Sequence, residues 1–267
     1  GSTSGGAVSI ALNVADITIG TDTGGSTRIP AAFTGITGFK PTQDNISRNG
    51  CLTLSSSLDS IGLMAKNVEL CKKGYGVMKE KKTPNEKSNN KGIKFIIPSN
   101  FGFENIEPDV ELAFNLAKQK IIENGYNIVE EELPILETYK KVPLWQFAAV
   151  ECQAEYFEAY TEKKHLIDPN ILKRMDRAND VMAIEYKLLL KMREELIKEF
   201  NSFLKNNFLT FLSIKYWFTF LIPGKPKNSS NLTHLPTSSA TPHENPIALE
   251  ARLTAVSISL KDLITKY

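Results

Sequence analysis

The chain has 267 residues, 42% of them hydrophobic and 23% charged, which is typical of one soluble globular domain with a substantial core. A formal net charge of +2 excludes a strong overall positive field, so the charge does not argue for nucleic-acid or anionic-membrane binding. The cysteines Cys51, Cys71 and Cys152 lack metal-ligand spacing and no signal peptide is visible, so we expect free thiols in a reducing compartment, the cytoplasm or an organellar matrix.

The chain begins with a Ser/Gly-rich turn, GSTSGG, at residues 1–6. We expect the apolar residues 7–12 to form a helix and the run Ile-Thr-Ile at 17–19 to form a short buried strand. That strand leads directly into residues 20–30, GTDTGGSTRIP, the stretch on which the functional interpretation depends.

The stretch at 20–30 places one hydroxyl at a glycine turn, because Gly24 and Gly25 come directly before Ser26. Glycine adopts backbone angles that side chains forbid and lets another molecule approach the main chain closely. A hydroxyl among bare N–H groups suits a nucleophile beside an oxyanion hole. A plain turn with a capping serine fits the same residues, whereas a P-loop would need a Lys-Ser or Lys-Thr pair that is absent.

Four stretches together resemble the amidase signature family, serine hydrolases with a Ser-Ser-Lys triad. They are GSTSGG at 1–6, GTDTGGSTRIPAA at 20–32, GITGFKPT at 35–42 and SLDSIG at 57–62. The resemblance is dense over residues 1–78, looser over 91–208 and patchy beyond. It implies an α/β fold with a mixed, largely parallel central sheet flanked by helices.

The resemblance also implies the roles of the residues in the glycine turn. Ser26 would attack the amide carbonyl, and Ser2 would relay its proton. The backbone N–H groups of Thr23, Gly24, Gly25 and Ser26 would form the oxyanion hole. We therefore expect the hydroxyls of Ser2 and Ser26 to lie within hydrogen-bonding reach or one water apart. We also expect the N–H groups of Gly24 and Gly25 to have no protein acceptor.

Three further residues match supporting positions of the family. Asp22 and Arg28 would brace the loop as a buried pair, which a plain salt bridge would also explain. Thr3 stands where the family usually has serine, and its hydroxyl can serve the same network. Neither a metal nor a cofactor is implied.

The catalytic lysine of the family lies well upstream of the Ser2 position. Every lysine of this sequence lies downstream, beginning with Lys40, so we expect the catalytic lysine not to be in this chain. We expect residues 1–267 to be a partial amidase domain with impaired activity. Its segments would be a catalytic core at 1–78, a polar linker at 79–92 and the remainder of the domain at 93–267.

Beyond the core segment, local signals predict helices and strands. Residues 68–78 predict a helix, and residues 52–58 predict a loop with a short strand. A strand at 94–97, a helix from Pro108 to before Gly125, and a strand at 126–129 predict a parallel pair with a right-handed crossover. We expect the strands at 17–19 and 94–97 to belong to one sheet.

The rest of the chain predicts long helices and one atypical insertion. Residues 144–160 and 169–206 predict helices. One apolar face of the second is marked by Ile171, Met175, Ala178 and Met182. Residues 209–222, LTFLSIKYWFTFLI, are short for a membrane span, and Lys215 interrupts them. A buried strand or a mis-joined insertion over 209–245 is favoured over amphipathic membrane contact. A helix at 246–263 follows.

The resemblance implies an amidase that hydrolyses a carboxylic amide C–N bond through an acyl-enzyme on serine. Its partner would be a small-molecule amide substrate, with no direct nucleic-acid contact. One alternative is the A subunit of a glutamyl-tRNA(Gln) amidotransferase, which releases ammonia from glutamine and works with partner subunits. A second alternative is a non-catalytic remnant.

Overall fold

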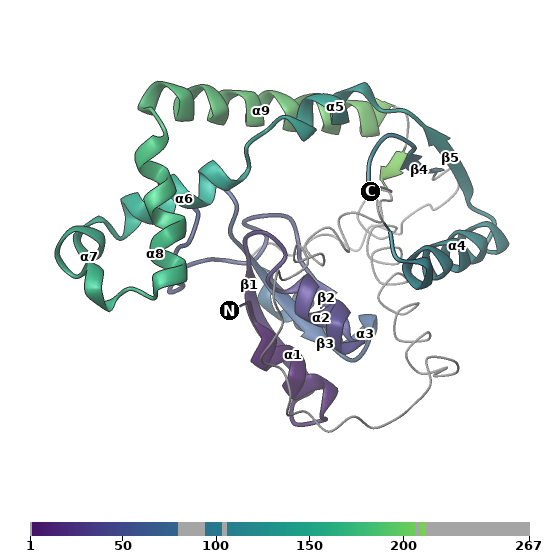
Figure 1. Ribbon diagram of the computed structural model, residues 1–267. Helices are drawn as coiled ribbons and strands as arrows, with labels where there is room; N and C mark the ends of the chain where they lie inside the picture. The colour runs from purple at the N-terminus through teal and green to yellow at the C-terminus, as the bar shows by residue number, and fades with distance from the viewer. Residues whose placement is uncertain (1, 80–93, 103–105, 207–208, 212–267) are drawn as a thin grey trace.

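The computed structural model describes residues 2–79, 94–102, 106–206 and 209–211 (Figure 1). These residues form two three-stranded sheets with helices around them. The antiparallel sheet has the order β1-β3-β2 and the parallel sheet has the order β5-β4-β6. Helix and strand thus mix as the α/β class requires, and the predicted parallel pairing is confirmed for one of the two sheets.

The antiparallel sheet consists of β1 (Ile17–Asp22), β2 (Thr37–Phe39) and β3 (Ser60–Ala65). All six residues of the central strand β3 are buried. Since side chains alternate along a strand, Met64 points to one face and Leu63 and Ala65 to the other. Both faces are therefore packed.

Three helices cover the antiparallel sheet: α1 (Ser4–Ala11), α2 (Arg28–Thr34) and α3 (Val68–Met78). Residues of α1 and α2 pack with Met64, and Cys71 of α3 packs with Leu63 and Ala65. Helix α2 ends at Gly35, whose φ of 68° is a left-handed conformation that glycine adopts at little cost. The sheet and its helices form the support for the loop between β1 and α2.

The parallel sheet consists of β4 (Lys94–Pro98), β5 (Asn127–Glu131) and β6 (Leu209–Phe211). Helix α4 (Pro108–Glu123) connects β4 to β5, with proline at its first turn and Gly125 just beyond its end. The predicted strand–helix–strand unit is therefore confirmed. Its apolar face is formed by Phe95, Ile97, Phe114 and Ile121.

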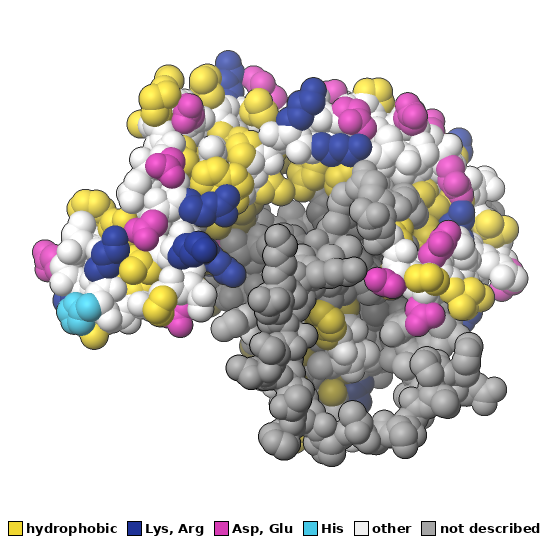
Figure 2. Space-filling view, in the orientation of Figure 1, with side chains coloured by type: hydrophobic (Ala, Val, Ile, Leu, Met, Phe, Trp, Pro, Cys, Tyr) yellow, Lys and Arg dark blue, Asp and Glu magenta, His cyan; other side chains and the backbone are white. Residues whose placement is uncertain are grey.

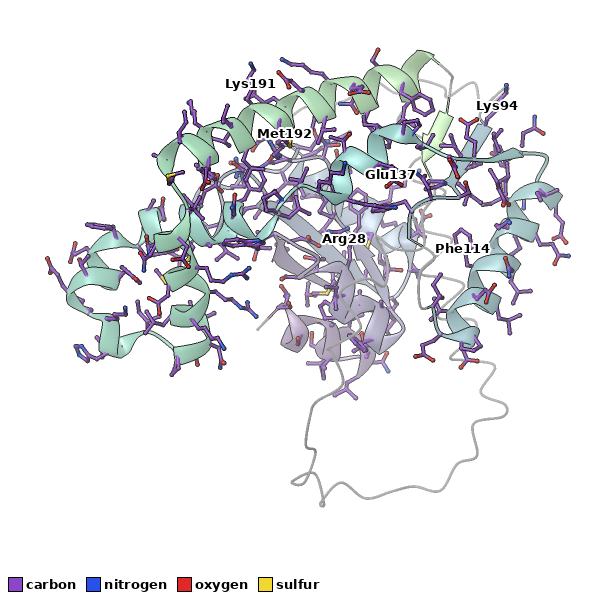
Figure 3. The ribbon with its side chains drawn as sticks, turned by 45° about the horizontal axis from the view of Figure 1, so that its top comes forward. Arg28, Lys94, Phe114, Glu137, Lys191 and Met192 are labelled. Atoms are coloured by element: carbon purple, nitrogen blue, oxygen red, sulfur yellow. The ribbon has the colours of Figure 1, made fainter. Side chains whose placement is uncertain are left out.

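Five helices fill most of the segment between β5 and β6. They are α5 (Pro134–Lys140), α6 (Trp145–Glu155), α7 (Phe157–Glu162), α8 (Pro169–Asp176) and α9 (Ala183–Asn206). With 24 residues, α9 is about 36 Å long and runs from the α6–α8 group to the parallel sheet (Figure 1). In Figure 3, α5 with Glu137 lies beside α9 with Lys191 and Met192.

The expectation of one central sheet is wrong for the described residues. Strands β1 and β4 belong to different sheets, and β1 is antiparallel to its neighbour β3. An apolar run predicts that a segment is a strand, but it specifies neither the partner nor the direction of that strand. The sequence signals do not predict β3, β2 or α5, and residues 52–58 contain no strand.

Both predicted long helices are interrupted. The first breaks at Tyr156, between α6 and α7, and the second breaks after α8 at a 3-10 turn, Arg177–Asp180. The side chain of Asn179 at this turn accepts from Gln153 and donates to Tyr160, so tertiary contacts hold it. The proposed apolar face is therefore only half correct: Met175 and Ala178 are buried, whereas Ile171 and Met182 are exposed.

Several expectations concern residues outside the described ranges. They are most of the linker at 79–92, the insertion at 209–245 beyond β6, and the helix at 246–263. Within the described helices, none combines the length and the apolarity that crossing a membrane requires. Figure 2 shows hydrophobic side chains on the outer surface near α9, where Ile184 and Leu188 are more than half exposed.

Candidate active site

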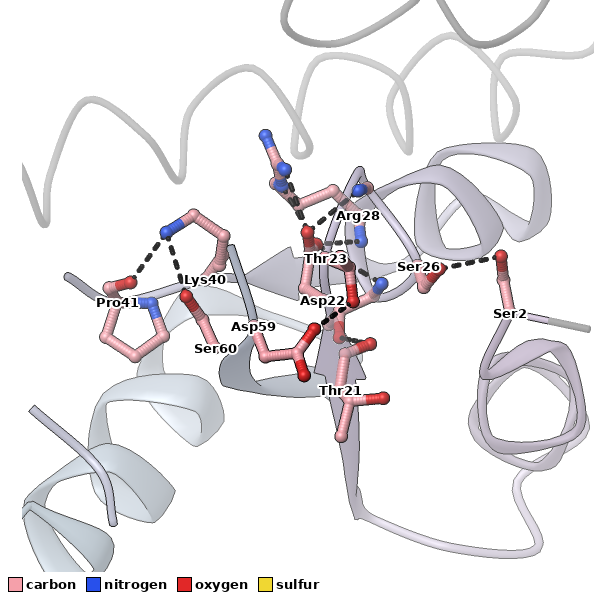
Figure 4. Close-up of polar contacts among 12 residues, drawn as sticks. Ser2, Thr21, Asp22, Thr23, Ser26, Arg28, Lys40, Pro41, Asp59 and Ser60 are labelled. Atoms are coloured by element: carbon pink, nitrogen blue, oxygen red, sulfur yellow. Dashed lines mark hydrogen bonds and ion pairs between the residues drawn. The ribbon is translucent and has the colours of Figure 1, made fainter. Parts of the chain in front are cut away.

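The hydroxyls of Ser2 and Ser26 meet where the loop after β1 passes the start of α1 (Figure 4). Ser2 Oγ lies 3.0 Å from Ser26 Oγ, and the backbone N–H of Thr3 donates to the carbonyl oxygen of Ser26 at 3.0 Å. The predicted proximity of the two hydroxyls is confirmed. The backbone bond fixes the two segments together, so the contact does not depend on the hydroxyls alone.

Asp22, the last residue of β1, organises the loop from beneath. Its side chain is fully buried and accepts from Arg28 Nε at 3.0 Å and from Arg28 Nη2 at 2.9 Å. It also accepts from the backbone N–H groups of Gly25 at 2.8 Å and Thr27 at 3.3 Å. Burial opposes the charged carboxylate, but the Arg28 contacts and these N–H groups outweigh it and hold the pKa of Asp22 below its usual range. The expected Asp22–Arg28 pair is confirmed.

The expectation for the glycine amides is half correct. The Gly25 N–H is not free, because it donates to Asp22, and Gly25 has a φ of 117° that only glycine adopts readily. Within the described residues, no acceptor takes the N–H groups of Thr23, Gly24 or Ser26. A buried carboxylate three residues earlier competes for the donor, which a turn motif alone does not reveal.

Asp59 braces the loop from the other side, a role that the sequence pattern does not assign to it. It is 6% exposed, accepts from the Thr23 hydroxyl, and also accepts from the N–H groups of Leu54 and Ser55 at 2.8 and 2.9 Å. The only signal in the sequence is its place in the SLDSIG stretch. Asp22 and Asp59 thus hold the glycine turn between two carboxylates.

Thr3 packs close to the strand that leads to the glycine turn, whereas Lys40 lies away from the two serine hydroxyls. The Thr3 side chain lies against the Cα of Gly20, where a Cβ would come within 2.4 Å of Thr3 Oγ1. Lys40 donates to the carbonyl of Pro41 at 2.9 Å and contacts Ser60 Oγ at 3.5 Å. Figure 4 shows Lys40 on the far side of the Asp59 contact from the serines. Among the described residues, no lysine is hydrogen-bonded to either serine hydroxyl.

A hollow of about 450 Å³ opens beside the loop. Its lining is mostly polar and includes Thr21, Arg48, Cys51, Ser56 and Asp59. Asp59 thus belongs both to this hollow and to the support of the glycine turn, and the carbonyl oxygen of Thr21, which also lines the hollow, accepts from the Thr27 hydroxyl at 3.3 Å. The hollow offers room for a small polar group next to the turn.

Comparisons with known proteins identify the family of the chain. The sequence model of the amidase family matches residues 1–212. Indoleacetamide hydrolase of Allorhizobium ampelinum is 37% identical over 145 residues, which are 54% of this chain and 31% of that protein. The A subunit of the glutamyl-tRNA(Gln) amidotransferase of Fusobacterium nucleatum is 34% identical over 148 residues, 50% of this chain and 30% of that protein.

Solved structures of amidases resemble the fold of the chain. A crystal structure of an amidase matches with a TM-score of 0.65 and 28% identity, over 73% of this chain and 44% of that one. Allophanate hydrolase of Kluyveromyces lactis, at 22% identity, shows the same fold with a TM-score of 0.65 over 77% of this chain and 36% of that one. The chain spans about a third of the length of the curated relatives named above. Because the family model covers well over half of its residues, the chain belongs to the amidase family.

Proposed function

We propose that Ser26 is the nucleophile of an amidase that hydrolyses a carboxylic amide C–N bond of a small-molecule substrate through an acyl-enzyme. The observation that carries this proposal is the 3.0 Å contact between the hydroxyls of Ser2 and Ser26 on a turn with unpaired N–H groups. In this mechanism Ser26 Oγ attacks the carbonyl carbon and its proton passes to Ser2. The C–N bond then breaks as the leaving amine takes the relayed proton back through Ser2, and water hydrolyses the acyl ester to a carboxylate and free Ser26.

The N–H groups of Gly24 and Ser26, with Thr23 beside them, are the donors for the oxyanion of the tetrahedral intermediate. Losing one such donor typically costs about 3 kcal/mol of transition-state stabilisation. The Gly25 N–H serves a different purpose, because its bond to Asp22 fixes the turn. Of the four residues that the family resemblance implies for the oxyanion hole, we thus retain Thr23, Gly24 and Ser26. We also propose that the catalytic core consists of residues 1–78.

The proton of Ser2 needs a base, and we propose a neutral lysine outside residues 1–267, as the family pattern implies. A serine hydroxyl is a weak nucleophile until a base takes its proton. Removing one member of a cooperating triad costs nearly as much as removing all of them. We therefore expect little or no turnover from residues 1–267 alone and robust turnover from a longer polypeptide that supplies the lysine ahead of Ser2.

The experiment compares Ser26→Ala with the parent in that longer polypeptide. Ser26→Ala should abolish both hydrolysis of small amides and labelling by a fluorophosphonate, a serine-directed reagent. Ser99→Ala is the matched control, because Ser99 is an exposed serine beside the parallel sheet. Turnover that persists after Ser26→Ala would show that the chemistry lies elsewhere. Absence of labelling in the parent would favour a non-catalytic remnant.

The second candidate function is the A subunit of a glutamyl-tRNA(Gln) amidotransferase. It is favoured by the relatives with that name, which are 34–37% identical over half of this chain. Under this function the substrate is glutamine, the product is ammonia, and partner subunits are required. Glutamine hydrolysis that rises at least tenfold when partner subunits and glutamyl-tRNA are added would select it over the stand-alone amidase.

A further inference from the structure

The side chain of Glu151 connects the helical region to the loop before β3. Glu151 lies on α6, and its Oε2 accepts from the Ser55 hydroxyl and, at 3.0 Å, from the backbone N–H of Ser57. Its Oε1 accepts from the Ser57 hydroxyl and from Tyr186 of α9. Four donors therefore converge on one carboxylate, and three of them belong to the short segment at 55–57.

A second contact joins the same segment to α9. Arg193 Nη2 donates to the carbonyl oxygen of Ser57 at 2.8 Å. The residues at this junction are half-buried or buried, and Ser55 has no exposed surface. A partly buried carboxylate that accepts from four donors holds them in one geometry, because each donor would lose a charge-assisted hydrogen bond if it moved away.

The segment at 55–57 is in turn bonded to the glycine turn. The backbone N–H of Ser55 donates to Asp59 Oδ2 at 2.9 Å, and the other oxygen of Asp59 accepts from the Thr23 hydroxyl. Thr23 is adjacent to Gly24 and contributes one of the unpaired N–H groups of the turn. A continuous path of hydrogen bonds thus runs from Glu151 through Ser55 and Asp59 to Thr23.

We propose that Glu151 is a positioning residue of the Ser26 site, which sets the orientation of the Thr23 and Gly24 N–H groups through Ser55 and Asp59. This inference rests on the proposed function, since it assigns Glu151 a part in the reaction of Ser26. Glu151 is not the missing base, because both of its oxygens are occupied by donors of the 55–57 segment and Tyr186.

The charge of Glu151 supports this role. Burial opposes ionisation, but the hydrogen bonds from Ser55, Ser57 and Tyr186 outweigh it and keep the pKa of Glu151 below its usual range. Burial and the bond to Glu151 also raise the pKa of Tyr186, so the tyrosine stays a donor. The carboxylate therefore accepts from all four groups at neutral pH, and an amide in its place would present a donor to some of them.

The test is the labelling of Ser26 by a fluorophosphonate in the longer polypeptide that supplies the lysine. Glu151→Gln should lower the maximal labelling rate by about 10- to 100-fold, the loss expected when reacting groups are misplaced by about 1 Å. The concentration of reagent that gives half of that rate should change by less than about twofold, because both oxygens of Glu151 are occupied by protein donors rather than directed at Ser26. Thr23→Val cuts the same path at its other end. In the double variant its effect should not add to that of Glu151→Gln.

Asp176→Asn is the matched control. Asp176 Oδ1 accepts from Tyr160 at 2.7 Å and from Lys164 at 3.1 Å, so it holds helices of the same region together without a bond to the 55–57 segment. It should lower the thermal midpoint and leave the labelling rate of the folded protein unchanged. If Glu151→Gln does no more than Asp176→Asn, the positioning role is overturned.

Two further results keep the inference separate from the proposed function. If Ser26→Ala still reacts with the reagent at the site, the proposed function fails, whatever Glu151 does. If labelling depends on Ser26 but not on Glu151, only the positioning role fails. Should Glu151→Gln not fold, Tyr186→Phe removes a single donor, and a three- to tenfold lower labelling rate is expected, on the order of the loss of one hydrogen bond. An unchanged rate in that variant would overturn the role.

Discussion

The two sheets are built around different kinds of core. Every described polar or charged residue that is buried lies in the region of the antiparallel sheet, within residues 1–78. These residues are Asp22, Thr27, Thr37, Ser55, Asp59 and Ser60. Around the parallel sheet, the described buried side chains are apolar, with Phe95 and Ile96 fully enclosed. Among the described residues, all of these polar or charged side chains except the Thr37 hydroxyl are hydrogen-bonded, and apolar clusters also pack on both faces of the antiparallel sheet. Buried polar groups require such partners, so hydrogen bonds add to apolar packing in the first region, whereas the described core of the second region is apolar.

The substitution with the largest expected effect disrupts the polar core. Asp22→Ala should lower the free energy of unfolding by about 3–5 kcal/mol, because it removes the fully buried carboxylate of an ion pair that also accepts from two backbone N–H groups. Labelling of Ser26 should be lost as well, since Gly25 and Thr27 lose their acceptor. Urea unfolding and fluorophosphonate labelling measure the two effects.

Asp44→Asn is the control for Asp22→Ala. Asp44 is paired with Arg48, but its side chain is 69% exposed, so the change should cost no more than about 1 kcal/mol. Equal losses from the two variants would mean that burial does not distinguish the two aspartates.

The substitution with the second-largest expected effect disrupts the apolar core around the parallel sheet. Ile96→Ala should destabilise the protein by about 2–5 kcal/mol, because it opens a cavity between β4 and the residues packed on it. Labelling of Ser26 in the fraction that remains folded should stay at the level of the parent. Leu112→Ala on the exposed side of α4 is the control and should change stability by less than about 0.5 kcal/mol. A loss of labelling in folded Ile96→Ala would contradict the division between the two regions.

A smaller effect sharpens the comparison inside the first region. Gly20→Ala should cost about 1–3 kcal/mol, because its Cβ would lie 2.4 Å from Thr3 Oγ1 and 2.9 Å from Thr3 Cβ. Thr3 would move and weaken its backbone bond to Ser26, so labelling should slow. Gly76→Ala in α3 has open space for its Cβ and should stabilise the protein by about 0.5–1 kcal/mol. Thermal unfolding checks both variants: the midpoint should fall for Gly20→Ala and rise for Gly76→Ala. Shifts of the two midpoints in the same direction would contradict this prediction.

The smallest effect concerns acid stability. The folded-state pKa of Asp22 lies below its ordinary value of 3.8, so its contribution to stability is fully present above that value. The contribution is lost as the pH falls through the lower, folded-state pKa. Unfolding measured between about pH 5 and pH 2 should therefore show a steeper loss for the parent than for Asp22→Asn. Parallel slopes would indicate that Asp22 contributes nothing to acid sensitivity.

Local signals in the sequence predict those elements whose ends are set by neighbouring residues. Helix α3 begins and ends as predicted, and Pro108 and Gly125 mark the limits of the crossover helix correctly. The meeting of Ser2 with Ser26 is predicted by motif resemblance rather than by spacing. These features depend on residues that lie close together in the sequence or on a specific pattern.

The rest depends on contacts between distant residues, which spacing does not encode. Glu151 reaches Ser55 across 96 positions of the sequence, and no motif connects them. The capture of the Gly25 N–H by Asp22 depends on how the carboxylate turns beneath the loop. The assignment of β1 to an antiparallel pair depends on β3, whose residues carry no clear strand signal of their own.

The central place of β3 has a consequence for the order of folding. Strands β1 and β2 both pair with β3 and not with each other, so neither has a partner until β3 inserts between them. The loop that carries Ser26 leaves the ribosome before β3 does. Pairing Asp22 with Ser60 requires the long loop between them to close, and this closure costs conformational entropy. The helix of the crossover unit forms through local contacts and has no such cost. Because Asp22, which fixes the turn of Ser26, pairs with Ser60, the support of the reactive hydroxyl depends on a strand that follows it in the sequence.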